Sequence, residues 1–144
     1  MGLTKIFEPI KIGNLELANR IVSPPLSSGS MKDGYVTDRM LAFYKELARS
    51  GVSLVITEDS MVDTPIGKHQ IEDVSIDDDK FIPGLARLAK TIKDNGSKAA
   101  ITISHAGRMG GRVIRGELLI TKGLIPVAPS SLPTPSPGYT VPAN

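Results

Sequence analysis

Three apolar runs in this chain of 144 residues each end abruptly in polar residues, and this pattern constrains the fold most. The clearest covers residues 101–108, where the run leads into a histidine, a glycine and an arginine. The other two cover residues 21–27 and 54–60. Short apolar runs rich in β-branched residues are typical of buried parallel strands, whose carboxyl ends meet at one edge. We therefore predict that the three strand ends are neighbours and form part of one site.

Two stretches with helical periodicity separate these runs. Residues 40–48 carry one apolar stripe behind Thr37, a good N-cap, and residues 85–92 carry another. The acidic triplet 77–79 precedes the second stripe, and it fits a helix start better than a metal site. Strands separated by amphipathic helices indicate right-handed crossovers and a parallel sheet. The strands are expected at residues 20–23, 52–57 and 97–104.

The ends of the chain follow different patterns. Residues 7–17 alternate in polarity around Gly13 and Asn14, which predicts a hairpin with a two-residue turn. Residues 58–76 are expected to be irregular. Residues 105–144 are expected to form a long loop rich in glycine, arginine and proline. Its last part, residues 131–144, fits either an excursion over a site or a disordered tail.

Composition excludes several classes of protein. Apolar residues make up 40% and charged residues 22%, which is typical of a globular domain. The net charge of +2 is too small to indicate a nucleic-acid partner. The absence of cysteine excludes disulfides, zinc–thiolate sites and iron–sulfur ligation within this segment. No run is long enough for a membrane helix or resembles a signal peptide, so a cytoplasmic protein is expected.

Polar residues at the strand ends are the candidates for chemistry. His105 at the end of the third strand is expected to be functional, whereas His69 lies in a polar loop and is not. Arg108 lies in a glycine-rich loop that suits an anionic ligand, although a solvated basic loop explains it equally well. Glu58 fits a structural hydrogen-bond acceptor better than a catalytic base.

The turn after the first strand is more specific. Pro24 and Pro25 stiffen the chain where that strand ends, because neither can donate to a strand ladder. The backbone groups that follow are then held in fixed directions, which suits a flat ligand with a polar edge. Ser27 adds a hydroxyl that can donate to a ligand carbonyl.

Several motifs in this order resemble those of one known family. They are Leu15-Glu16-Leu17-Ala18-Asn19-Arg20-Ile21-Val22, Pro25, Gly34, Thr37, Thr57-Glu58, His105-Ala106-Gly107-Arg108 and Pro126-Val127-Ala128-Pro129-Ser130. The chain resembles the old yellow enzyme family of flavin-dependent ene-reductases, and more closely its branch of enoate and 2,4-dienoyl-CoA reductases. The resemblance covers residues 5–132.

The resemblance implies a fold and a reaction. The fold is a (β/α)8 barrel closed at the bottom by an N-terminal hairpin, of which residues 1–144 would supply about three βα units and a long loop, leaving the barrel incomplete. FMN would lie across the carboxyl ends of the strands and be reduced by NADH or NADPH. Hydride would then pass to an alkene conjugated to a carbonyl or thioester. An iron–sulfur cluster and FAD are expected only in a longer parent chain.

The resemblance also assigns residues to the cofactor. Those expected to line the flavin are Pro24, Pro25, Leu26, Ser27, Asp59 and Thr102. Two of them depart from the family pattern, because Asp59 stands where glycine or alanine is usual and Thr102 where a glutamine contacts the flavin. The usual proton donor lies beyond Asn144, so His105 and Arg108 would face the site without being the main donor.

Partners and alternatives follow from the incomplete barrel. Three parallel strands with an open edge need a covering partner, which is the remainder of the barrel, another subunit or a second copy of the chain. The substrate would be a small alkene. One alternative is an inactive or partner-completed half-barrel. Another is a different barrel enzyme, a lyase or aldolase, with Glu58 as base and His105 as acid.

Overall fold

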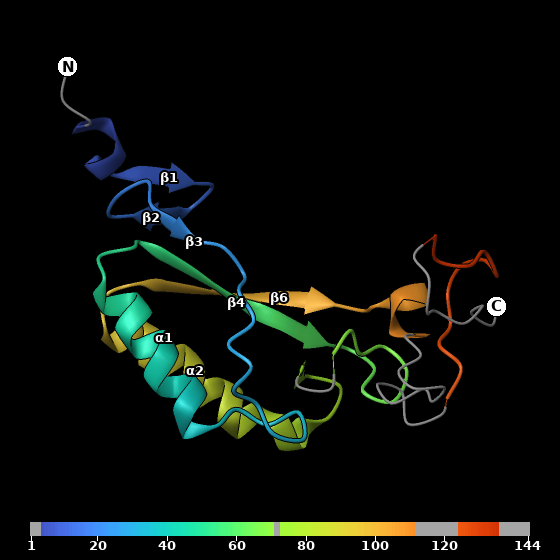
Figure 1. Ribbon diagram of the computed structural model, residues 1–144. Helices are drawn as coiled ribbons and strands as arrows, with labels where there is room; N and C mark the ends of the chain where they lie inside the picture. The colour runs from blue at the N-terminus through green and yellow to red at the C-terminus, as the bar shows by residue number, and fades with distance from the viewer. Residues whose placement is uncertain (1–3, 71–72, 112–123, 136–144) are drawn as a thin grey trace.

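The computed structural model describes residues 4–70, 73–111 and 124–135 (Figure 1). Its elements in chain order are η1 Thr4–Phe7, β1 Ile10–Ile12, β2 Leu15–Leu17, β3 Val22–Ser23, α1 Asp38–Arg49, β4 Leu54–Met61, β5 Val74–Ser75, η2 Asp79–Phe81, α2 Ile82–Asp94, β6 Lys98–Ser104 and η3 Gly107–Gly111. The predicted order of hairpin, strand, helix, strand, helix and strand is confirmed.

Strand β4 is the centre of a parallel sheet. Strand β6 pairs with one edge of β4 along its length, while β3 and β5 pair in parallel with the beginning and the end of β4. Strand β6 occupies one edge of β4 both at its beginning and at its end. Strands β3 and β5, which pair with these same two parts of β4, must therefore share its opposite edge. The prediction that the three strands are neighbours is therefore confirmed.

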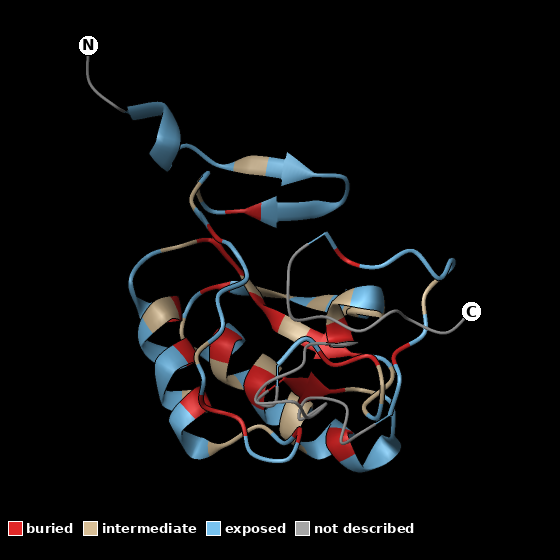
Figure 2. Ribbon diagram, turned by 45° about the vertical axis from the view of Figure 1, so that its right-hand side comes forward, coloured by how far each residue is buried: buried red, intermediate tan, exposed pale blue. Residues whose placement is uncertain are grey.

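Helices α1 and α2 pack side by side against one face of this sheet (Figure 1). The Thr37 hydroxyl caps α1 by accepting from the Met40 N–H, as the sequence predicts. Met40, Tyr44 and Ala48 lie four residues apart and are buried, so α1 turns one stripe towards the sheet (Figure 2). With Met31, Val55, Val74, Leu88 and Ile92, these residues form the core. No helix in the described part of the chain is long and apolar enough to cross a membrane.

The N-terminal hairpin lies at the amino ends of β4 and β6, opposite the loops at their carboxyl ends (Figure 1). Strands β1 and β2 pair antiparallel, with Ile10 opposite Leu17. Gly13 has a φ of 57°, which the two-residue turn requires and glycine adopts without strain. The prediction of this hairpin and its turn is confirmed.

The bounds of the first two sheet strands differ from the prediction. The first was expected at residues 20–23, but β3 has only two residues. Just before it, Ser53 donates to the carbonyls of Asn19 and Ile21. The second was expected to end at Thr57, yet β4 continues to Met61. The region 58–76 was therefore wrongly predicted to be irregular throughout, since it also contains β5.

A β-bulge explains why β4 continues through polar residues. Ile56 pairs with Ala100 and Asp59 with Thr102, so Thr57 and Glu58 together oppose a single residue of β6. The bulge frees two backbone groups. The Glu58 N–H donates to the Tyr44 hydroxyl at 2.8 Å, and the Thr57 carbonyl accepts from the Thr102 hydroxyl at 2.8 Å. Both groups are therefore satisfied inside the sheet.

Candidate functional site

The carboxyl ends of β3 and β4 meet the loop before β5 at a small polar pocket. It is lined by Pro25, Ser27, Glu58, Asp59, Gln70 and Asp73, and its volume of about 40 Å³ suits roughly one water molecule. The described residues contain no group of three or more histidine, cysteine or acidic side chains arranged to hold a metal ion. The pocket is thus a polar niche beside the strand ends rather than a complete ligand cavity.

Glu58 is the most constrained acidic side chain of this niche. It is 2% exposed, and both of its carboxylate oxygens are bonded. The Ser28 N–H donates to Oε2 and the Ser28 hydroxyl to Oε1, each at 2.8 Å, while the Tyr44 hydroxyl lies 3.4 Å from Oε1. Burial raises the pKa of Glu58, and hydrogen bonds from Ser28, Tyr44 and Ser27 lower it in part. Burial also raises the pKa of Tyr44.

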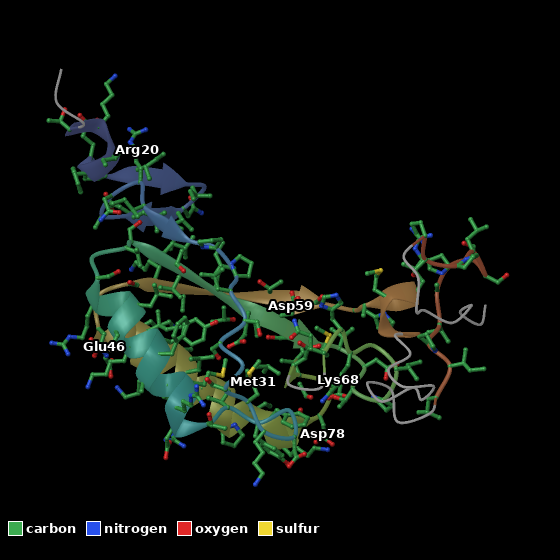
Figure 3. All side chains as sticks on the ribbon, viewed as in Figure 1. Arg20, Met31, Glu46, Asp59, Lys68 and Asp78 are labelled. Atoms are coloured by element: carbon green, nitrogen blue, oxygen red, sulfur yellow. The ribbon has the colours of Figure 1, made fainter. Side chains whose placement is uncertain are left out.

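Asp59 and Thr102 are direct partners across β4 and β6, and both are half-buried. Figure 3 shows Asp59 towards the carboxyl end of β4. The two positions that depart from the family pattern therefore lie side by side. The proton of the Thr102 hydroxyl is committed to the Thr57 carbonyl, so this hydroxyl can only accept from a ligand.

Asp73 is a buried residue of the niche that the sequence did not single out. Its Oδ2 accepts from the backbone N–H groups of His69 and Gln70 at 2.7 and 2.6 Å, which closes the loop before β5. Burial raises its pKa, and the nearby charge of Asp59 adds to this increase. No repeating pattern in the sequence marks Asp73, because its role comes from hydrogen bonds inside an irregular loop.

His105 follows β6 and connects two loops. Its Nδ1 accepts from the Gly107 N–H at 2.9 Å, so in the neutral ring the proton is on Nε2, which is left as a donor. A Cβ on Gly67 would lie 2.7 Å from His105 Cδ2, which shows how closely the ring packs on that backbone. The Ala106 N–H donates to the Gly67 carbonyl at 2.8 Å.

Arg108 contacts the last described segment, residues 124–135. Its Nη1 donates to the Pro133 carbonyl at 3.5 Å, and the Thr134 hydroxyl donates to the Arg108 carbonyl at 3.2 Å. Thr134 is buried. Residues 131–135 therefore contact the segment that follows β6, and whether they cover a site stays a prediction. The rest of the predicted long loop lies outside the described residues. This includes residues 136–144 and the arginines and glycine between 112 and 116.

The structure brings only some of the predicted site residues together. Pro25, Ser27 and Asp59 share the niche, and Thr102 lies beside it on β6. Pro24 and Leu26 belong to the same exposed loop as Ser27. His105 and Arg108 come after the neighbouring strand and do not line the niche.

This arrangement is typical of one class of protein. Helices on one face of a parallel sheet, a hairpin at the amino ends and polar loops at the carboxyl ends define the amino-terminal part of a (β/α)8 barrel with a site at its mouth. Residues 5–130 match the NADH:flavin oxidoreductase / NADH oxidase family, and the chain belongs to this family.

Two relatives show how much of such a protein this chain represents. It is 41% identical over 129 residues to the NADH oxidase of Thermoanaerobacter brockii, covering 89% of this chain and 19% of that protein. It is 41% identical over 106 residues to the NADPH dehydrogenase of Bacillus subtilis, covering 72% of this chain and 31% of that protein. The chain thus spans about a fifth to a third of these relatives.

Solved structures give the same fold. The old yellow enzyme from Pichia sp. AKU4542 superposes with a TM-score of 0.75 and 30% identity, covering 89% of this chain and 32% of that one. A complex of 2-naphthoyl-CoA reductase with 2-naphthoyl-CoA superposes with a TM-score of 0.83 and 25% identity, covering 97% and 22%. The predicted resemblance to old yellow enzymes, and the predicted partial barrel, are confirmed.

Proposed function

We propose that this chain is the flavin-facing, amino-terminal part of an FMN-dependent ene-reductase that also needs the remainder of the barrel. The observation that best supports this is the placement of the loop 24–27, Asp59 and Thr102 around one edge of the sheet in a chain of this family. When bound, FMN would supply the hydride chemistry, taking electrons from NADH or NADPH and delivering them to an alkene conjugated to a carbonyl or thioester.

The exposed loop at the carboxyl end of β3 fits the edge of a flat cofactor. Pro24, Pro25 and Leu26 present apolar surface. The Ser27 hydroxyl would donate to a ligand carbonyl in place of its bond to the Glu58 carboxylate. Asp59 offers an acceptor to a ring N–H group. Its negative charge would make reduction of a bound flavin harder. Thr102 can accept but not donate, because its proton is bonded to the Thr57 carbonyl.

The outer edge of β6 supports the need for more of the barrel. Ile101 and Ile103 are 45% and 69% exposed, and an apolar groove of about 390 Å³ runs between β6 and α2. Its lining includes Leu85, Ala89 and Ala100. Exposed apolar strand edges of this kind promote association unless they are covered. We assign this surface to the following βα unit of the barrel, in the same polypeptide or another subunit, with a second copy of the chain as the alternative.

The other predicted residues take supporting roles in this proposal. His105 can donate from Nε2 at the mouth of the barrel, and Arg108 carries the positive charge that suits an anionic group of the cofactor or substrate. We place any iron–sulfur cluster and FAD in a longer parent chain, since this chain has no cysteine.

A lyase or aldolase is the weaker candidate. That reaction would use Glu58 as its base, but the Glu58 carboxylate is buried and bonded on both oxygens. A base must lie within hydrogen-bond reach of the proton that it removes. Glu58 in this position therefore fits a structural role better than a catalytic one.

The test of the proposed function is alkene reduction by the complete barrel. NADH and NADPH consumption would be followed with and without cyclohexenone, an acrylate ester and an enoyl thioester. We expect faster consumption with at least one alkene. We also expect alkene reduction to slow by up to about 10²-fold in Ser27→Ala, because loss of one preorganised donor at a charge-stabilising site costs about that much. Consumption of NAD(P)H that no alkene accelerates would contradict the ene-reductase proposal.

A further inference from the structure

Glu58 joins three parts of the chain through one buried carboxylate. It lies in β4, it receives two hydrogen bonds from Ser28 in the loop after β3, and it contacts the Tyr44 hydroxyl of α1. Thirty residues separate Ser28 from Glu58, so these bonds are a long-range link rather than a local turn. The carboxylate therefore determines where the loop after β3 lies relative to the sheet.

The two bonds from Ser28 also fix the direction of that loop. One comes from its backbone N–H and the other from its hydroxyl, and they reach different carboxylate oxygens, so the residue can neither slide nor rotate freely. Farther along, the Thr37 hydroxyl donates to the Ser30 carbonyl, and the Ser30 hydroxyl donates to the Ser28 carbonyl. The segment from Ser27 to Ser30 is thus held at its middle by Glu58 and at its end by the cap of α1.

Tyr44 holds Glu58 in place from the other side. Its hydroxyl accepts the bulge N–H of Glu58 at 2.8 Å and lies 3.4 Å from Oε1. The hydrogen bonds to the two carboxylate oxygens all come from donors, Ser28 and Tyr44. A buried carboxylate costs folding free energy that an apolar residue of similar size would not. This cost is reasonable where the position of a loop matters more than stability.

We propose that Glu58 is a positioning residue that orients the Ser27 hydroxyl and the Pro24–Pro25 turn at the mouth of the barrel by clamping Ser28. Glu58 itself does not reach a ligand in this role, because its side chain is buried beneath the loop that it holds. The consequence for flavin binding rests on the function proposed above. The clamp itself is a property of the chain without ligand.

The variants that test the clamp are Glu58→Gln, Ser28→Ala and the double variant. Glutamine keeps the size of the side chain but replaces one acceptor oxygen with a donor, which faces another donor at Ser28. Ser28→Ala removes only the hydroxyl and is the safer variant if Glu58→Gln folds poorly. Glu46→Gln is the matched control, because Glu46 is an exposed glutamate of α1 that bonds only Arg49.

Two measurements on the complete barrel carrying these variants separate the clamp from the cofactor. Amide hydrogen exchange at residues 26–30, the part of the loop that carries backbone N–H groups, should become faster without ligand in Glu58→Gln and Ser28→Ala and stay unchanged in Glu46→Gln. The dissociation constant for FMN should rise about tenfold in each single variant, equivalent to about 1.4 kcal/mol. The dissociation constant of the double variant for FMN should equal the larger of the two single-variant values, because both changes break the same link.

Three results would overturn the proposal. They are unchanged exchange at residues 26–30 in Glu58→Gln, unchanged FMN affinity in both single variants, and multiplicative losses in the double variant. A wild-type barrel that binds no FMN would contradict the proposed function instead, and the exchange measurement would still decide whether Glu58 clamps the loop.

Discussion

Single hydroxyl groups stabilise the irregular backbone of β4. The Thr102 hydroxyl donates to the Thr57 carbonyl, and the Tyr44 hydroxyl accepts from the Glu58 N–H. Each bond replaces a ladder bond that the bulge removes. The threonine at position 102 therefore has a structural explanation, independent of any ligand. The resemblance to the family indicated only that threonine stands here in place of a glutamine that contacts the flavin.

The role of Thr102 can be tested by removing its hydroxyl. Thr102→Val keeps the shape of the side chain but leaves the Thr57 carbonyl without its donor, which should lower the free energy of unfolding by about 1–3 kcal/mol. Thr102→Ser retains the hydroxyl and serves as the control. Urea denaturation of both variants provides the measurement, and equal stability would show that the bond to the bulge contributes little.

The buried carboxyl of Glu58 predicts a particular pH dependence. Burial raises its pKa above the usual 4.5, so the folded protein keeps this proton to a higher pH than the unfolded chain. Its favourable contribution to stability is then complete below pH 4.5 and is lost as the pH rises through the folded pKa. Glu58→Gln cannot titrate and should lose less stability over this range.

The measurement is the free energy of unfolding of wild type and Glu58→Gln across that pH range. The free energy of unfolding of Glu58→Gln should increase relative to that of the wild type as the pH rises. Asp73 also has a raised pKa through burial, but it is present in both proteins and cancels from the difference. A difference that stays constant with pH would contradict the raised pKa of Glu58.

At the scale of elements, periodicity predicted what is long and regular. Helices α1 and α2, the hairpin and the three main strands all follow from repeating apolar positions and from caps such as Thr37. A strand of two residues such as β5 has no measurable period, and a bulge reverses the alternation inside β4. These two features were therefore missed, and with them the extension of β4 to Met61.

The candidate site was predicted to a similar extent. The rule that chemistry lies at the carboxyl ends of parallel strands placed Ser27 and Asp59 near one another, as the structure has them. The same rule grouped His105 and Arg108 with them, but these two residues do not line the niche. Thr102 was singled out by the family resemblance alone. Asp73 was missed because it reaches the niche through hydrogen bonds within a loop that has no repeating pattern. Which side chains are buried there depends on tertiary contacts rather than on local sequence.

The exposed edge of β6 gives a prediction about assembly. Ile103→Lys should change the stability of the separate chain by no more than about 0.5 kcal/mol, because the side chain is already exposed. It should weaken binding to a separately produced remainder of the barrel, since a charge would then be buried at the contact. Leu132→Lys, at an equally exposed position, is the control.

Analytical ultracentrifugation of the mixed chains measures this assembly. Equal association by wild type and Ile103→Lys would show that the β6 edge is not the contact. Self-association of the chain that is lost in Ile103→Lys would instead favour a second copy of the chain as its partner.

At the scale of the whole molecule, the chain corresponds to only part of the barrel of its relatives. It covers 22% and 32% of the two structures with which it was compared, and its sheet keeps one apolar edge exposed among the described residues. Polar groups, in contrast, gather where β3 and β4 end. The fold therefore presents one surface suited to barrel completion and another suited to a ligand.

The most direct test of the central claim is a flavin spectrum of the purified complete barrel, together with the mass of the released cofactor. We predict flavin absorption bands and the mass of FMN, at about one equivalent per barrel, with both absent from a barrel remainder that lacks residues 1–144. A correctly folded complete barrel that remains colourless after incubation with FMN would contradict the claim that this chain forms part of a flavin site.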